Sequence, residues 1–94
     1  MFNNTKEVIW NNEKNKWLKE VRGISFEEVI ACIDHGGLIH RILNPNQDKY
    51  PGQEEFIISC KEYVYIIPFE ETRQYYFLKT IIPSRKAKKK YSIN

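Results

Sequence analysis

The residues best suited to chemistry in this 94-residue sequence are cations near its C-terminal end. Residues 84–91 hold five lysines and arginines and no acid. The whole chain has 15 basic and 12 acidic residues and a net charge of +3, so the remainder has ten against twelve, a net charge of −2. This asymmetry indicates an anionic partner, either nucleic acid or an acidic protein; a solvated helix face is the alternative.

Cations and tyrosines of this kind can support the cleavage of RNA. A base takes the proton of a ribose 2′-hydroxyl, cations stabilise the charge that builds on the phosphate, and an acid protonates the leaving oxygen. Arginine grips phosphate with two parallel bonds, and exposed aromatic rings stack on unpaired bases. The residue types alone do not separate such an enzyme from an RNA- or DNA-binding module.

Other chemistries find no support in the sequence. It contains no GxSxG, HExxH, P-loop or GxGxxG motif, so we expect no cofactor and no metal. Cys32 and Cys60 lie far apart in apolar surroundings, which favours buried free thiols. With His35 and His40 they give no zinc-binding spacing, so we expect His35 to lie at a helix C-terminus and His40 to be an ordinary strand residue.

Length and hydropathy favour one cytoplasmic domain spanning residues 1–94. Hydrophobic residues make up 41% of the chain, which is enough to build a core without metal or disulfides. No run approaches the roughly 20 apolar residues that a membrane span needs, and residues 1–12 do not resemble a signal peptide.

The first third of the chain predicts a strand at residues 6–10 and two helices. Asn11 or Asn12 can cap a helix over residues 12–22. Helical periodicity places one set of its residues on the inward face, namely Trp17, Leu18 and Val21, and another on the outward face, namely Asn15, Lys19 and Arg22. Gly23 ends this helix, and Ser25 with Glu28 forms a capping box that starts the second helix, which Gly36 and Gly37 end.

The rest of the chain is typical of an antiparallel sheet. A strand at residues 38–43 and a loop at 44–53 precede β-rich runs at 55–60, 63–69 and 74–82, joined by links of hairpin length. Pro83 ends the last run, and Ser84 can cap a basic helix that reaches Tyr91. We therefore predict an α+β fold in which two N-terminal helices pack on a mainly antiparallel sheet of four to five strands, with a short C-terminal basic helix.

Three segments resemble the BrnT-like toxins of bacterial type II toxin–antitoxin systems. They are IWNNEKN at residues 9–15, RGISFEE at 22–28, and IIPSRKA at 81–87 with Tyr91 following. The family has a Trp-Asp-x-x-Lys-x-x-x-Asn opening, a Lys-His-Gly-Ile-Ser-Phe-Glu-Glu centre and an Ile-Ser-Ala-Arg-x-Ala ending before a Tyr. The segments occur in the same order here and bracket almost the whole chain.

The resemblance implies a RelE-like fold and a ribonuclease that arrests translation. It also implies a small, DNA-binding antitoxin that inhibits the toxin in a hetero-oligomer and represses their promoter. The chain departs from the family at Arg22, where relatives commonly have histidine, and at Pro83 and Ser84, which replace Ser-Ala. Arginine does not give up its proton, so it cannot replace histidine as a general base.

By position, the resemblance assigns the opening lysine to Lys14, the ending arginine to Arg85 and the final tyrosine to Tyr91. We expect Arg85 to stabilise phosphate, with Lys79 and Arg22 as further cations and Tyr91 as a proton donor. Four lysines are expected to bind RNA: Lys14, Lys19, Lys86 and Lys89. The alternatives are that Arg85 pairs with Glu70 or Glu71, and that the Tyr91 ring only packs in the core.

Two other functions stay open at this point. One is a non-catalytic RNA- or protein-binding module on the same scaffold, which the arginine at position 22 favours. The other is a DNA-binding repressor, which is less favoured because no helix-turn-helix pattern accompanies the basic segment.

Overall fold

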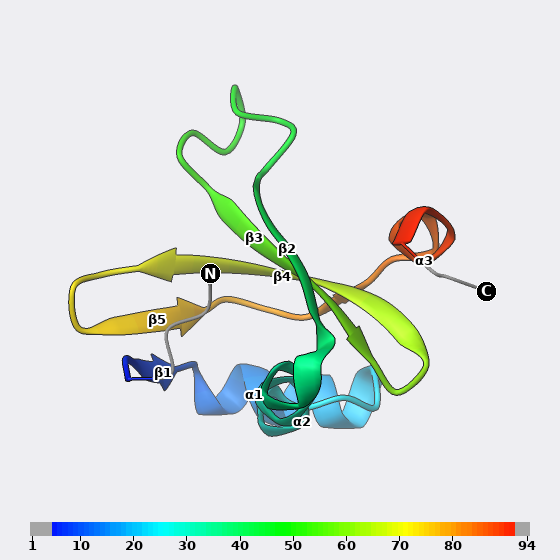
Figure 1. Ribbon diagram of the computed structural model, residues 1–94. Helices are drawn as coiled ribbons and strands as arrows, with labels where there is room; N and C mark the ends of the chain where they lie inside the picture. Colours follow the sequence, from blue (N-terminus) through cyan, green and yellow to red (C-terminus); the bar gives the residue numbers. More distant parts are fainter. Residues whose placement is uncertain (1–4, 92–94) are drawn as a thin grey trace.

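The computed structural model describes residues 5–91, which form three α-helices and six strands (Figure 1). The strands are β1 (Glu7–Ile9), β2 (Leu38–Leu43), β3 (Glu54–Cys60), β4 (Tyr63–Glu71), β5 (Tyr75–Leu78) and β6 (Ile82–Pro83). The helices are α1 (Asn12–Val21), α2 (Phe26–Cys32) and α3 (Arg85–Tyr91), and a π-helical turn (Ile33–Gly37) follows α2.

The strands form one sheet in the order β1-β5-β4-β3-β2, and β6 pairs with β4 further along. All pairs are antiparallel except β1 with β5. The predicted α+β class is therefore confirmed, whereas the predicted number of four to five strands is wrong.

The sixth strand arises because the run predicted at 74–82 is interrupted. Leu78 pairs with Phe69 and Ile82 pairs with Ile66. The segment 78–82 therefore contains one more residue than the segment 66–69 of β4 that it faces. An extra residue shifts the alternation of side chains between the two faces. As a result Leu78 and Ile81 are both fully buried, and Ile82 is exposed.

Helices α1 and α2 cover one face of the sheet (Figure 1). The core on this face is built around stacked aromatic rings: Phe56 and Phe69 lie 3.8 Å apart, and Tyr76 meets both rings edge-on. The predicted capping box at the start of α2 is present, since Ser25 Oγ accepts the Glu28 N–H and Glu28 accepts the Ser25 N–H.

Helix α1 is turned relative to the predicted orientation. Leu18 is buried as expected, but Trp17 and Val21 are 40% and 60% exposed, and Asn15, predicted to face outward, is 4% exposed. The reason is that the Asn15 side chain bonds to α2. Its Oδ1 accepts the Phe26 N–H at 2.8 Å and its Nδ2 donates to Glu27 Oε1 at 2.7 Å. Asn15 thus caps the neighbouring helix.

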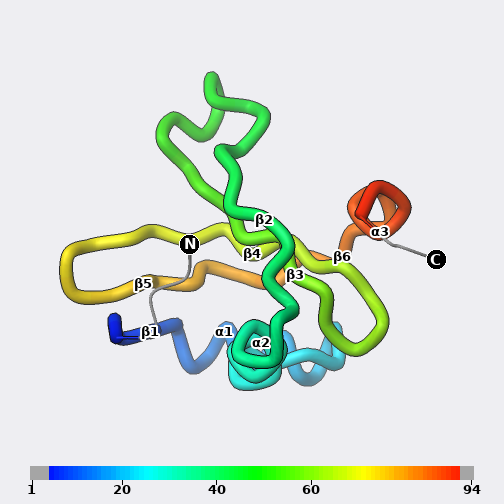
Figure 2. Tube along the Cα trace, in the orientation of Figure 1, coloured from blue at the N-terminus to red at the C-terminus, as the bar shows by residue number. Residues whose placement is uncertain are grey.

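The other face of the sheet is covered in part by α3 (Figure 2). Ala87 is buried there and Tyr91 packs beside it, against a cluster formed by Ile57 and Val64 with Ile39, Ile42 and Ile66. The predicted cap is confirmed, because Ser84 Oγ accepts the Ala87 N–H at 3.0 Å.

The prediction of free thiols is wrong, because Cys32 and Cys60 form a disulfide. The packing of α2 on β3 brings their Cα atoms to 5.5 Å although 28 residues separate them in the chain. Gly37 shares this close approach, since a Cβ atom there would overlap the carbonyl oxygens of Ser59 and Cys32. Within residues 5–91, no helix is long and apolar enough to cross a membrane.

Removal of the Asn15 amide is expected to destabilise the fold. Asn15→Ala leaves the N–H of Phe26 buried without its acceptor, which costs about 1–3 kcal/mol of unfolding free energy. Asn12→Ala, a change at an exposed position of the same helix, should alter it by less than about 0.5 kcal/mol. Urea denaturation of both variants measures the difference, and equal midpoints would show that Asn15 does not join the helices.

Candidate nucleic-acid interface

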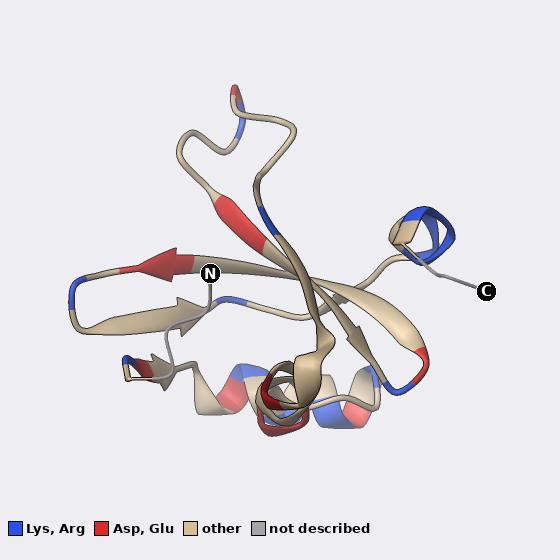
Figure 3. Ribbon diagram, viewed as in Figure 1, with Lys and Arg blue, Asp and Glu red and all other residues tan. Residues whose placement is uncertain are grey.

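Helix α3 presents an uncompensated positive charge. It contains five of the chain's cations and no acid (Figure 3), and none of the five forms an ion pair within residues 5–91. Lys88 and Lys90 lie over the rings of Tyr63 and Tyr91, at 5.0 and 5.3 Å. The side of α3 away from the sheet is therefore a cationic surface open to an anion.

By contrast, five cations elsewhere are neutralised by glutamates. The pairs are Lys6–Glu71, Lys19–Glu27, Arg41–Glu54, Arg41–Glu71, Lys61–Glu28 and Lys79–Glu70. The uneven charge predicted from the sequence is thus concentrated further by pairing, because much of the positive charge outside α3 is cancelled locally.

Arg85 is exposed at the first position of α3. The alternative that it pairs with Glu70 or Glu71 is wrong, because Glu70 pairs with Lys79 and Glu71 with Lys6 and Arg41. Lys86 and Lys89 are likewise exposed and without an acidic partner in the described chain. These three side chains are the ones best placed to receive phosphate.

Lys79 lies in a different environment. Its Nζ donates to Gln53 Oε1 at 2.9 Å and lies 3.3 Å from Glu70 Oε1. It lines a hollow of about 320 Å³ in which three of the lining residues are glutamates, Glu54, Glu70 and Glu71. The charge of Lys79 is therefore shared with acids, and the hollow is unsuited to a polyanion.

Arg22 and Lys14 surround the exposed ring of Trp17. The Arg22 guanidinium lies 5.0 Å and the Lys14 ammonium 4.3 Å from its centre. Arg22 also donates from Nη1 to the backbone oxygen of Ile81, at 2.5 Å, and so covers a carbonyl beside β6. Lys19 lies 4.0 Å from Glu27. These cations have roles within the fold.

Tyr91 is both a packing residue and part of a surface pair. Its ring packs against the apolar cluster beneath α3, as the packing alternative requires. It also meets the His40 ring edge-on, and the two ring centres lie 5.2 Å apart. His40 is exposed on β2. Nothing in the sequence predicted this pair, because the contact depends on where α3 crosses the sheet; the only available signal was that the chain has two histidines.

The four residues expected to be catalytic make no direct contact with one another within residues 5–91. In the described chain no hydrogen bond, ion pair or ring contact joins any two of Arg85, Lys79, Arg22 and Tyr91. Arg85 and Tyr91 lie at opposite ends of α3, about 9 Å apart along its axis. His35 lies beside the C-terminal end of α2, as expected, and its Nδ1 lies 2.7 Å from the carbonyl oxygen of Ala31.

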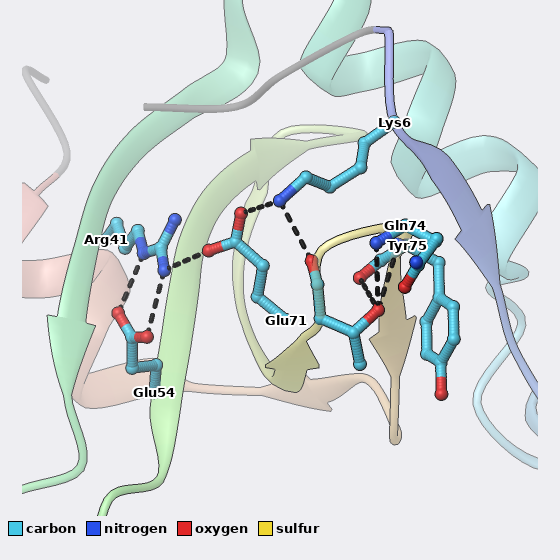
Figure 4. A network of polar contacts seen from close by, with 7 residues as sticks. Lys6, Arg41, Glu54, Glu71, Gln74 and Tyr75 are labelled. Atoms are coloured by element: carbon cyan, nitrogen blue, oxygen red, sulfur yellow. Dashed lines mark hydrogen bonds and ion pairs between the residues drawn. The ribbon is translucent and has the colours of Figure 1, made fainter.

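A partly exposed ion network joins strands of the sheet away from α3 (Figure 4). Arg41 contacts Glu54 with both Nε and Nη2 and reaches Glu71, which also binds Lys6. The hydrogen bond from Lys6, and then that from Arg41, lower the pKa of Glu71 to about 2. Arg41 likewise lowers the pKa of Glu54. This network joins the segment before β1 to β2, β3 and β4.

No group of three His, Cys, Asp or Glu side chains within residues 5–91 is arranged to hold a metal ion. Comparisons with protein-family models, with curated proteins and with solved structures find no match to this chain.

The Glu71 network predicts a specific dependence of stability on pH. Since the pKa of Glu71 is lower in the folded state than in the unfolded chain, its stabilisation is present above about pH 4.5 and is lost as pH falls towards 2. Glu71→Gln should lower stability at pH 7 by about 1 kcal/mol, because the side chain is partly exposed, and should flatten the acid-induced loss.

Glu70→Gln is the matched control, because Glu70 is more exposed and has a single cationic partner. Urea denaturation at pH 7 and pH 3 gives both quantities. An acid-induced loss as steep in Glu71→Gln as in the wild type would contradict the role of the network.

Proposed function

We propose that this chain is an RNA-cleaving toxin of the BrnT-like, RelE-related class, inhibited by a cognate antitoxin. The observation that carries the proposal is the exposed charge of α3, which has no ion-pair partner within residues 5–91 and lies across the sheet face opposite α1 and α2. The three sequence segments that resemble the family supply the rest of the support, since Arg85 and Tyr91 both belong to the last of them.

The basic helix is better suited to binding single-stranded RNA than to reading the base sequence of duplex DNA. It has seven residues, and Ala87 and Tyr91 face the sheet, so its outer side offers lysines and one arginine, which bind phosphate of any sequence, and none of the asparagine or glutamine side chains that read adenine. Phosphate contacts of this kind give strong, salt-dependent binding with little sequence preference. Any choice of RNA sequence would come from elsewhere on the surface.

The expected RNA-binding and catalytic residues differ in whether they already have a partner within the protein. Arg85, Lys86 and Lys89 are exposed, have no acidic partner among the described residues, and would hold and attract phosphate. The remaining four cations have partners within the protein and would contribute less: Lys79, Arg22, Lys14 and Lys19. Tyr91 remains the proposed proton donor, because its ring is only partly buried.

The proposed reaction is internal transesterification of RNA. The 2′-oxygen bonds to the adjacent phosphorus as it loses its proton, the bond from phosphorus to the 5′-oxygen breaks, and that oxygen takes up a proton. The products are a 2′,3′-cyclic phosphate and a 5′-hydroxyl. We propose that the reaction needs no metal and therefore persists in EDTA.

The proposal also includes a partner. An antitoxin that neutralises this chain would carry acidic side chains that cover α3, which blocks RNA by charge and by volume. We propose that it is encoded beside the toxin, binds DNA through a separate part and forms a cytoplasmic hetero-oligomer with the toxin.

A second candidate function is a non-catalytic RNA-binding module. The lack of any contact among the four expected catalytic residues within residues 5–91 favours it, as does the bond from Arg22 to the Ile81 carbonyl. Expression of the chain alone in bacteria distinguishes the two functions, because a binding module leaves cellular RNA intact whereas the toxin degrades it and arrests growth.

Loss of the Arg85 guanidinium should impair function without affecting the fold. Arg85→Ala is expected to reduce the rate of cleavage of single-stranded RNA in EDTA at least about 10-fold and to relieve growth arrest. Its unfolding free energy should change by less than about 0.5 kcal/mol, because the side chain has no partner in the described chain.

Arg73→Ala provides the control, since Arg73 is also exposed and unpaired within residues 5–91 but lies in the turn between β4 and β5. It should retain full activity. A fully toxic Arg85→Ala protein would exclude Arg85 from the site.

A further inference from the structure

We infer that His40 is the group that takes the 2′-hydroxyl proton, at the C-terminal end of α3. This inference rests on the proposed ribonuclease function and supplies the general base that the sequence did not reveal. It places the proton-transfer chemistry at the end of α3 opposite Arg85.

The geometry brings three kinds of side chain together from two elements. His40 comes from β2, and Tyr91 and Lys90 come from the last turn of α3. The Tyr91 ring lies 5.2 Å from the His40 ring and 5.3 Å from the Lys90 ammonium. An imidazole, a phenol and a cation are therefore neighbours on a surface that is open to RNA.

The surroundings of His40 on its own face of the sheet add one acid. His40 lies opposite Ile57 and Glu55 lies opposite Ile42, so Glu55 is the diagonal neighbour of His40. Glu55 is 6% exposed, and its Oε2 accepts a hydrogen bond from Asn44 at 2.9 Å. Burial raises the pKa of Glu55.

Of the titratable and charged groups near His40, Tyr91 from α3 contacts its ring, Lys90 from α3 contacts Tyr91, and Glu55 from β3 is its diagonal neighbour in the sheet. On the same strand, Arg41 belongs to the opposite face, where it lies over Phe69 and binds Glu54. Ile57, the residue directly opposite His40, is apolar. No acid among the described residues forms an ion pair with His40, so its imidazole is free to exchange a proton with a substrate.

His40 is also the only histidine of the described chain that is available for this role. The other, His35, lies in the turn after α2, where Nδ1 contacts the Ala31 oxygen at 2.7 Å. Histidine is the side chain that gains and loses a proton between pH 5 and 8, as a general base near neutral pH must. Lysine and arginine remain protonated there, so the cations of α3 cannot take this part.

The step balances with His40 and Tyr91 in complementary roles. The neutral imidazole takes the 2′-hydroxyl proton while the 2′-oxygen bonds to phosphorus. The bond to the 5′-oxygen breaks, and the Tyr91 phenol gives that oxygen a proton. Water then returns a proton to Tyr91 and removes one from His40. Arg85, about 9 Å away along α3, would bind a neighbouring phosphate of the same strand.

The test compares His40→Ala with His35→Ala, which removes the other histidine and leaves the site intact. Single-turnover cleavage of a single-stranded RNA is followed in EDTA between pH 5 and 8, and RNA affinity is measured separately. We expect His40→Ala to cleave RNA at least about 100-fold more slowly than the wild type and to show no rise of rate with pH. Its affinity for RNA should change by less than about 3-fold. His35→Ala should behave as the wild type.

Two further measurements separate proton transfer from a structural effect. Free imidazole in the buffer should restore part of the rate to His40→Ala and have no effect on the wild type. Tyr91→Phe keeps the ring that packs against His40 and removes only the hydroxyl, and it should slow cleavage at least about 10-fold without loss of stability.

The outcomes distinguish the inference from the function on which it rests. A wild-type protein that leaves RNA intact would overturn both. Cleavage by the wild type, with His40→Ala equally fast and equally dependent on pH, would overturn the assignment of His40 alone.

Discussion

Strands β3 and β4, which lie in the middle of the sheet, are apolar on both faces. In β3, Phe56 and Ile58 face one side, and Ile57 faces the other. Because apolar surface is stabilised by removal from water, at about 25 cal/mol for each Å², both sides of such a sheet need a cover. Helices α1 and α2 cover one, and a short third helix covers part of the other.

That second cover explains where the positive charge lies. Helix α3 has two residues that pack inward, Ala87 and Tyr91, one turn apart. Its other five residues are cations, so burying this stripe leaves all of them at the rim or the outer side. The same packing of α3 places Tyr91 beside His40 on β2. Core packing therefore decides both the position of the basic surface and the neighbour of its tyrosine.

Local signals in the sequence predicted the elements well. Asn11, Ser25 and Ser84 are caps whose side chains accept the N–H three residues further on, and all three helices begin where these signals place them. Contacts between distant residues were the source of the errors. The burial of Asn15 depends on an N–H group that α2 supplies, and the Cys32–Cys60 disulfide depends on the packing of α2 against β3.

The candidate site follows the same division. The basic segment was visible in the composition, but the sequence could not tell which cations are free, because Glu70 and Lys79 become partners only when β4 and the segment after β5 pair. The same holds for His40, whose neighbour Tyr91 is 51 positions away in the chain. Helical and strand periodicity describe one element at a time, whereas a site of this kind is made between elements.

We propose that an RNA strand lies along α3 towards β2. Chemical-shift mapping by NMR with a short single-stranded RNA, methylated at its 2′-oxygens so that it cannot react, tests this directly. We expect the largest changes on the amides of α3 and on the rings of His40 and Tyr91, while the indole of Trp17 on α1 changes little. Large changes at Trp17 with α3 unaffected would contradict it.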